Sequence, residues 1–208
     1  MKDEILQTAL RQFLKYGIRK MSIKKLVDPL GISTKTVYKY FKNKEELLEA
    51  VLHLHYTQQY QLLENHSADQ NVVSLIIDIW YMAIEGEYSV NKKFFHDLHY
   101  YYPELERKTE AVTGQKIWKK IGQIIQKGIK EGVFREDIYP EVAMESIAVL
   151  YTAIARTREF KRFHLSLHEI FLNTIVLYIR GLCTRKGIRQ LDKHSSTLEP
   201  SGRIWSVK

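Results

Sequence analysis

Apolar residues recur every three or four positions along most of the chain, which is the spacing of one face of an α-helix. The first such face ends just before Gly17, a residue type that often stops a helix, and it comprises Ile5, Leu6, Ala9, Leu10, Phe13 and Leu14. No run alternates apolar and polar residues for long, as a half-buried strand would. The pattern therefore predicts an all-α protein.

Residue types that cap helices mark the starts of three more helices in the N-terminal part. Ser22, Ser33 and Asn43 each precede a helical run, and an oxygen at this position accepts a hydrogen bond from a backbone N–H of the first turn. Glu46 follows Asn43 by three residues, as in a capping box. The second and third helices are short and flank Gly31, and the fourth is expected to run to about residue 66.

Pro29 lies near the end of the second helix and disturbs it. Proline removes a backbone donor, costs about 3 kcal/mol in a helix interior, and biases the preceding residue, here Asp28, away from the helical region. The same "DPLG" stretch suits a turn. Two outcomes stay open: the helix ends by about Asp28, or it continues in distorted form to Leu30.

The remaining chain also shows helical periodicity up to residue 182. Five further helices are expected, at about residues 71–86, 90–100, 103–134, 140–158 and 166–182. The first of these is apolar nearly all round, so it should lie in the middle of its domain. Residues 185–208 contain Ser, Thr, Pro and charge without periodicity and are predicted to be a mobile tail.

Two short helices around Gly31 have the spacing of a helix-turn-helix. In such a unit the second helix enters the major groove of DNA, and its N-terminal residues meet the base edges. Lysine reaches guanine acceptors, and threonine donates, accepts or touches a thymine methyl group. The residues predicted to face the bases are Thr34, Lys35, Thr36 and Lys39.

Charge is concentrated in the same segment. The whole chain has a formal net charge of +8, whereas residues 11–44 alone carry ten basic residues against one acid, Asp28, and so reach +9. The remainder is therefore about neutral. A basic unit on a neutral body is the electrostatic pattern expected for a protein that binds the phosphate backbone.

Other classes of protein find less support in the sequence. One cysteine, Cys183, allows no intrachain disulfide, and its apolar context indicates a small buried side chain. The N-terminus has no apolar signal-peptide core and no stretch is long enough to span a membrane, so a cytoplasmic location without membrane contact is expected. No catalytic constellation is evident, and the histidine pairs His96/His99 and His164/His168 lack a third metal ligand.

The N-terminal segment resembles the DNA-binding domain of the TetR family of bacterial transcriptional regulators. The resemblance rests on the apolar face of the first helix, on Phe13, Gly17 and Ser22, and on the stretches "GIS", "VYKYF" and "NKEEL". It covers about the first 50 residues. The family usually has a small residue at the position of Val27 and a polar one at Pro29, so this sequence departs from the pattern at "LVDPLG".

The resemblance implies roles for further residues. The phosphate contacts that it implies come from Ser22, Ser33, Tyr38, Tyr40 and Lys44. It also implies three regions: a helix-turn-helix domain at residues 1–46, a helical effector-binding and dimerisation domain at 47–184, and the tail at 185–208. No cofactor is expected, although an unidentified small-molecule effector is. The aromatic residues suggested for the effector pocket are Trp80, Phe94, Tyr100, Trp118 and Tyr151.

The last two predicted helices resemble those through which members of this family dimerise. Their apolar stripes would form a four-helix interface with two-fold symmetry, and the residues assigned to it are Ile147, Leu150, Ile154, Phe171, Thr174, Ile175 and Tyr178. The leading prediction is a homodimeric regulator, in the family's common mode a repressor, which an effector releases from a pseudopalindromic operator on double-stranded DNA. The alternative is a helical binding protein of the same fold that has lost operator reading.

Overall fold

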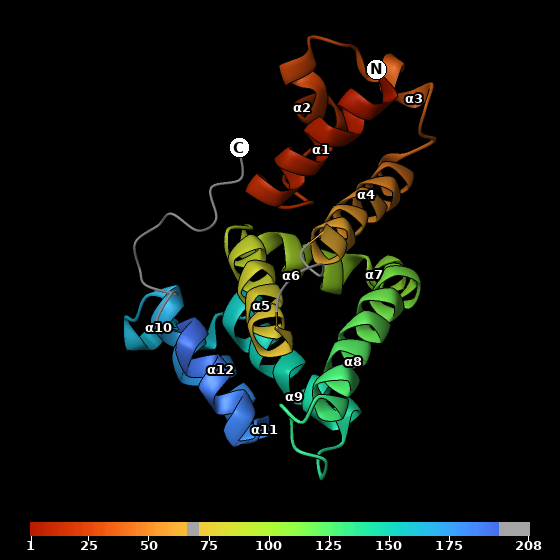
Figure 1. Cartoon of the computed structure of the whole chain (residues 1–208). Helices are drawn as coiled ribbons and strands as arrows, with labels where there is room; N and C mark the ends of the chain where they lie inside the picture. Colours follow the sequence, from red (N-terminus) through yellow and green to blue (C-terminus); the bar gives the residue numbers. More distant parts are fainter. Residues whose placement is uncertain (66–70, 196–208) are drawn as a thin grey trace. The chain divides into compact units, whose positions relative to one another are not determined.

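The chain folds into helices throughout the part that the structure describes. This computed structural model describes residues 1–65 and 71–195 (Figure 1), and within those ranges it has no strand beyond an isolated bridge between Phe134 and Cys183. The predicted all-α class is therefore confirmed. The chain divides into two compact units, Met1–Asn65 with Gly86–Ile117, and His66–Glu85 with Trp118–Lys208.

The first unit is built around one core shared by α1 and α4. Its helices are α1 (Lys2–Tyr16), α2 (Ile23–Val27), α3 (Thr34–Tyr38), α4 (Lys44–Asn65), α6 (Lys92–Tyr101) and α7 (Pro103–Thr109), which a π-helical turn at Glu110–Gly114 follows. The apolar face predicted for α1 packs into this core, with Ile5, Ala9, Leu10 and Phe13 buried. Gly17 then ends α1 at a φ of 84°, a value that L-residues with side chains rarely adopt.

The second helix ends early at the proline, which is the first of the two outcomes left open by the sequence. The α-helix ends at Val27, and Asp28–Leu30 continue as a single 3-10 turn that contains Pro29. Gly31 follows at a φ of 62°, in the left-handed region. The turn between the two short helices is therefore made by residues suited to it, and the proline does not prevent the motif.

Helix α6 closes the first unit against the end of α1. The backbone N–H of Asn91 donates to the Leu14 carbonyl at 2.9 Å, and the Asn91 side chain donates to the Lys15 carbonyl at 3.0 Å. The compact unit that holds the helix-turn-helix thus includes residues 86–117, which the sequence analysis assigns to the second domain. The difference arises because residues 86–117 pack against a segment that is distant in the sequence. Apolar periodicity along the chain does not show which distant segments pack together.

The second unit is organised around α5 (Val72–Tyr88), although the last residues of that helix belong to the first unit. Its other helices are α8 (Gln115–Lys130), α9 (Pro140–Tyr151), α10 (Leu167–Phe171), α11 (Leu177–Leu182) and α12 (Arg185–Ser195), and π-helical turns extend α9 and α10 at Thr152–Arg156 and Leu172–Val176. The prediction that α5 is buried on most sides is confirmed, since Val73, Ile76, Ile77, Ile79 and Trp80 are all buried. None of the described helices is long and apolar enough to cross a membrane.

Helix α12 corrects the prediction of a mobile tail beginning at residue 185. Thr184 caps this helix by accepting a hydrogen bond from the Gly187 N–H, and Leu191 is buried. His194 Nε2 lies 2.7 Å from Oδ1 of Asp78, a buried carboxylate on α5. The helix has only two large apolar residues, Ile188 and Leu191, so the sequence pattern gave little sign of it. The rest of the predicted tail, residues 196–208, lies outside the described residues.

Candidate DNA-binding surface

Each short helix of the motif starts at a serine that caps it. Ser22 Oγ accepts a hydrogen bond from the Lys25 N–H at 3.3 Å, and Ser33 Oγ accepts one from the Thr36 N–H at the same distance. Such caps satisfy one of the donors that a helix leaves unpaired at its start and are worth about 1 kcal/mol each. Ser33 Oγ also lies 3.1 Å from the Thr36 hydroxyl oxygen. This hydrogen bond holds the Thr36 side chain at the first turn of α3.

The outer face of α3 presents the residues predicted to face the bases. Lys35 and Lys39 are exposed, and Thr34 and Thr36 are half-buried. On the opposite face Val37 is fully buried, and Phe41 beyond the helix is buried too. These two residues anchor α3 to the core of the first unit, so its polar face is fixed in direction.

Both tyrosines near the end of α3, Tyr38 and Tyr40, are exposed. Tyr38 is 53% exposed and Tyr40 is 40% exposed. Their hydroxyl groups are therefore accessible, as the phosphate contacts implied for them require. Ser22 and Ser33 are exposed as well.

Lys44 differs from the other phosphate candidates because its ammonium group is turned inward. Its Nζ donates to the Ile18 carbonyl at 2.6 Å and lies 5.8 Å from the centre of the Phe13 ring. Desolvation lowers the pKa of Lys44, and the nearby Asp97 carboxylate partly opposes that shift. In this arrangement the side chain ties the start of α4 to the loop after α1.

Asp97 is a residue of this region that the sequence analysis missed. It is buried on α6, and its Oδ2 accepts a hydrogen bond from the Arg19 backbone N–H at 2.8 Å. The Arg19 guanidinium lies over the Tyr101 ring and donates to the Tyr101 hydroxyl at 2.8 Å. These contacts fix the loop between α1 and α2, and only the fold brings residues 78 positions apart together.

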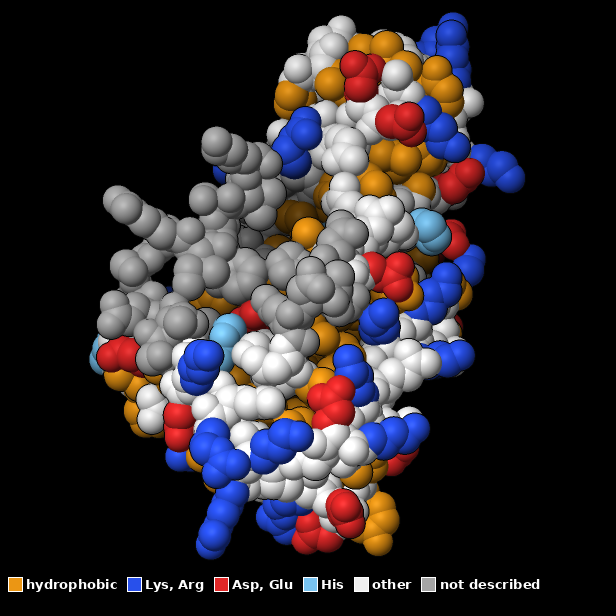
Figure 2. Space-filling model, viewed as in Figure 1, with side chains coloured by type: hydrophobic (Ala, Val, Ile, Leu, Met, Phe, Trp, Pro, Cys, Tyr) orange, Lys and Arg blue, Asp and Glu red, His pale blue; other side chains and the backbone are white. Residues whose placement is uncertain are grey.

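The basic residues of the segment remain largely available to an anionic partner. Of the ten between positions 11 and 44, all but Lys44 are exposed. In Figure 2 lysine and arginine side chains project from the edge at which Figure 1 places α3. A capped, outward-facing helix in basic surroundings is the arrangement that a helix-turn-helix needs to read a major groove.

Comparison with known proteins agrees with this geometry. Residues 5–51, from α1 into α4, match the sequence model of a family described as bacterial regulatory proteins, tetR family. The HTH-type transcriptional repressor KstR2 of Mycolicibacterium smegmatis is 26% identical over 148 residues, which are 66% of this chain and 69% of that protein. Residues 5–51 therefore form a DNA-binding domain of the TetR family. The matched family and relative are DNA-binding transcriptional regulators rather than enzymes, and this chain is assigned to the same class.

Solved structures of TetR-type and other regulators share the fold over most of the chain. The fatty acid degradation regulator FadR from Bacillus halodurans has a TM-score of 0.70 at 17% identity, covering 88% of this chain and 97% of that one. A transcriptional regulator from Saccharomonospora viridis, solved in complex with choline, has a TM-score of 0.70 at 18% identity, covering 88% and 98%. At these identities the likeness establishes the fold alone.

The aromatic residues suggested for an effector pocket are divided between the two units. Phe94 and Tyr100 belong to the first unit, where Phe94 is core and Tyr100 is 72% exposed. In the second unit Trp118 is 37% exposed, whereas the rings of Trp80 and Tyr151 meet edge to face at 5.8 Å between centroids. Only the last two residues therefore form a pair. Among the described residues no group of three or more His, Cys, Asp or Glu could hold a metal ion.

The residues assigned to the dimer interface mostly face inward. Ile147, Ile154, Phe171 and Ile175 are buried within their own chain, and Leu150, Thr174 and Tyr178 are half-buried. The four buried residues fill the core of the second unit and are not available to a second chain. The exposed apolar residues of α9 and α11 are Val142, Val149 and Leu177.

Proposed function

We propose that this protein is a homodimeric repressor of the TetR family that a small-molecule effector releases from a pseudopalindromic operator. The observation that carries the proposal is the exposed outer face of α3, which Ser33 caps and Val37 anchors. Two such helices in a symmetric dimer would meet successive major grooves about 34 Å apart.

Dimerisation is supported by apolar residues that one chain leaves exposed. Val142, Val149 and Leu177 are each 62% exposed, and Val142 and Val149 lie two turns apart on one face of α9. A two-fold interface would pair this face with its copy and remove the three side chains from water. The proposed interface thus uses the same helices as the sequence analysis but a different face of α9.

An effector is supported by an unusual buried group in the second unit. The indole N–H of Trp80 is buried and has no hydrogen-bond acceptor among the described residues. Such orphan donors are rare in native structures, and a bound molecule that supplies an acceptor would relieve the cost. The regulator from Saccharomonospora viridis with bound choline shows that a protein of this fold holds a small molecule.

Titration of a labelled duplex from next to the protein's own gene tests the proposal. We expect binding at least about a hundredfold tighter than to a duplex of the same composition in shuffled order. The pseudopalindrome should be protected on two half-sites, and sedimentation should give two chains per duplex. Binding that depends on salt but not on sequence would instead favour a protein that has kept the fold and lost operator reading.

A further inference from the structure

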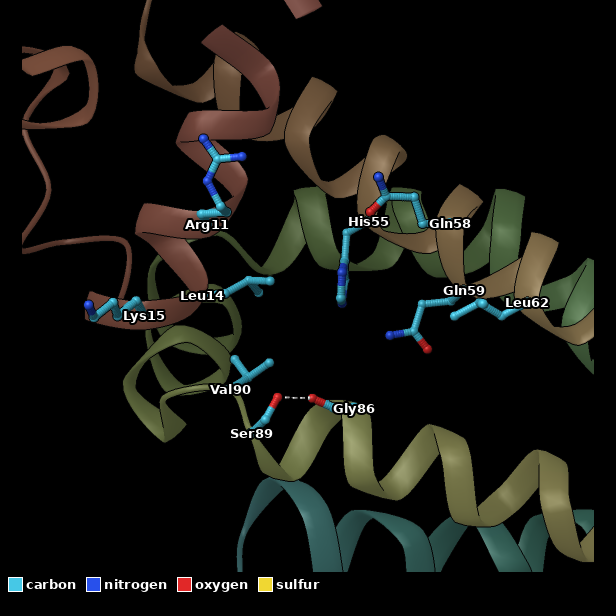
Figure 3. A pocket seen from close by; sticks show the side chains of 10 residues that line it. All are labelled: Arg11, Leu14, Lys15, His55, Gln58, Gln59, Leu62, Gly86, Ser89 and Val90. Atoms are coloured by element: carbon cyan, nitrogen blue, oxygen red, sulfur yellow. Dashed lines mark hydrogen bonds between the residues drawn. The ribbon is translucent and has the colours of Figure 1, made fainter. Parts of the chain in front are cut away.

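A cavity of about 410 Å³ opens within the first unit, among α1, α4 and the connection from α5 to α6 (Figure 3). This volume falls within the range of small-molecule sites in proteins. None of the aromatic residues suggested for the effector pocket lines it. It lies beside the helices that support the helix-turn-helix.

One side of the cavity is apolar. Leu14 of α1, Leu62 of α4 and Val90 between α5 and α6 all line the cavity, and their side chains point toward its interior in Figure 3. Leu62 is 48% exposed, which is unusual for a large aliphatic side chain inside a concave surface. An apolar ligand body would cover it and remove its surface from water.

The other side offers hydrogen-bonding groups. The Gln59 carboxamide points into the cavity in Figure 3, and it makes no hydrogen bond with any described residue. It carries both donors and an acceptor. The imidazole of His55 points inward beside it. A ligand with a polar substituent could therefore bind here without displacing an existing contact of Gln59.

The charges around the cavity have one sign. Arg11 and Lys15 of α1 line its edge and are exposed, and no carboxylate lines it. Arg11 donates only to the hydroxyl of Thr8, and the Lys15 ammonium lies 5.2 Å from the Tyr16 ring centre. Neither cation forms an ion pair among the described residues, so either side chain could swing toward an anionic group at the rim.

We propose that this cavity is a binding site for a small organic acid. The apolar body of the acid lies against Leu14, Leu62 and Val90, and its carboxylate is held at the rim by Arg11 and Lys15. The site belongs to the unit that carries α3, and it is separate from the effector pair of Trp80 and Tyr151 in the second unit. Because the acid contacts both α1 and α4, its binding stabilises the packing of these two helices.

The test is methyl NMR on the full-length protein labelled at leucine and valine, without DNA. The probes are butanoate, hexanoate, octanoate and benzoate, with the corresponding amides as uncharged controls. We expect at least one acid to shift the Leu14, Leu62 and Val90 methyl signals saturably and to leave Val149 of the second unit unchanged. Its amide should bind about fivefold or more weakly, because it cannot pair with the cations.

Variants at Gly86 and at the rim locate the site. A Cβ at Gly86 would lie 4.0 Å from Gln59 Nε2 with nothing nearer, so Gly86→Ala should bind the acid as before. Gly86→Phe fills the cavity and should abolish the shifts. The double variant Arg11→Gln/Lys15→Gln should bind acid and amide equally.

Three outcomes would overturn the proposal. The first is the absence of saturable shifts with every acid at about 10 mM, where a millimolar site would be mostly occupied. The second is unchanged binding in Gly86→Phe. The third is a preference for acid over amide that survives the loss of both cations. Because no DNA is present, failure here leaves the proposed repressor function standing, and failure of operator binding leaves this site standing.

Discussion

The short helices of the helix-turn-helix and helix α12 of the second unit are fixed by contacts of different range. The short helices α2 and α3 begin at serines that bond to backbone groups three residues away. The second unit depends on contacts between distant segments, such as the 116-residue separation between Asp78 and His194. Changes in the second unit should therefore mainly affect stability, whereas changes on the outer face of α3 should mainly affect DNA binding.

The largest expected effect is the loss of His194, which supports the buried carboxylate of Asp78. His194→Ala leaves Asp78 buried without this partner, and the cost of breaking such a pair is about 3 kcal/mol. Urea denaturation of the native protein and of the variant measures the loss in the free energy of unfolding. The control is Arg180→Ala, which removes the exposed ion pair between Arg180 and Asp192 and should change stability by less than about 1 kcal/mol. Equal losses in the two variants would mean that α12 is not held by Asp78.

Gly128 tests the close packing of the second unit. A Cβ there would lie 2.3 Å from Cδ2 of Phe134 and 3.0 Å from a methyl group of Val72. Gly128→Ala should therefore lower the free energy of unfolding by about 2 kcal/mol, although alanine is the better helix former. Gly86→Ala is the matched control in open space and should be neutral or stabilising by up to about 1 kcal/mol. A stable Gly128→Ala protein would show that Phe134 can move aside.

The difference between local contacts and contacts of distant segments also explains which features could be predicted from the sequence. The ends of α2 and the cap of α3 follow from Ser22, Pro29 and Ser33, because capping and proline geometry act over a few residues. The inward direction of Lys44 could not be predicted, since the Ile18 carbonyl that it meets belongs to another segment.

The periodicity of apolar residues predicts the apolar stripes of the helices in the second unit, but it does not predict what packs against each stripe. It predicted two apolar stripes, one with Ile147 and one with Phe171, yet a stripe alone does not show whether the chain's own core or a second chain covers it. Helix α12 was not predicted because Ile188 and Leu191 are the only large apolar residues among its eleven. The cavity beside α1 likewise depends on which segments the fold brings together.

On the helix-turn-helix side, Lys35→Ala should weaken operator binding without loss of stability. Lys35 is exposed on α3, so its removal should cost about 1–3 kcal/mol for the operator and less for random duplex. Lys24→Ala on α2 is the control, since it removes the same charge away from the first turn of α3 and should weaken both duplexes alike. Fluorescence anisotropy on both duplexes measures the ratio. Parallel losses from Lys35→Ala would contradict a role in base contact.

A smaller change is expected from the cap of α3. Ser33→Ala removes the acceptor for the Thr36 N–H and should cost about 1 kcal/mol of stability. It should also weaken operator binding, because the first turn of α3 is then less well fixed. Ser33→Asp restores an acceptor, so it should recover the stability but not the DNA affinity, since its negative charge would face the phosphates. Thermal unfolding and anisotropy together separate the two effects.

The smallest effect at neutral pH belongs to Cys183, which is buried in the second unit. Burial raises the pKa of its thiol from 9.0 to about 11. The folded chain therefore holds the proton more tightly than the unfolded chain, and this contribution to stability is complete below pH 9 and is lost as the pH rises through about 11. Unfolding free energies of the native protein and of Cys183→Ala, measured from pH 7 to 11, should differ by a constant up to about pH 9 and then converge. A difference that stays constant to pH 11 would show that the thiol ionises as easily in the folded chain as in the unfolded one.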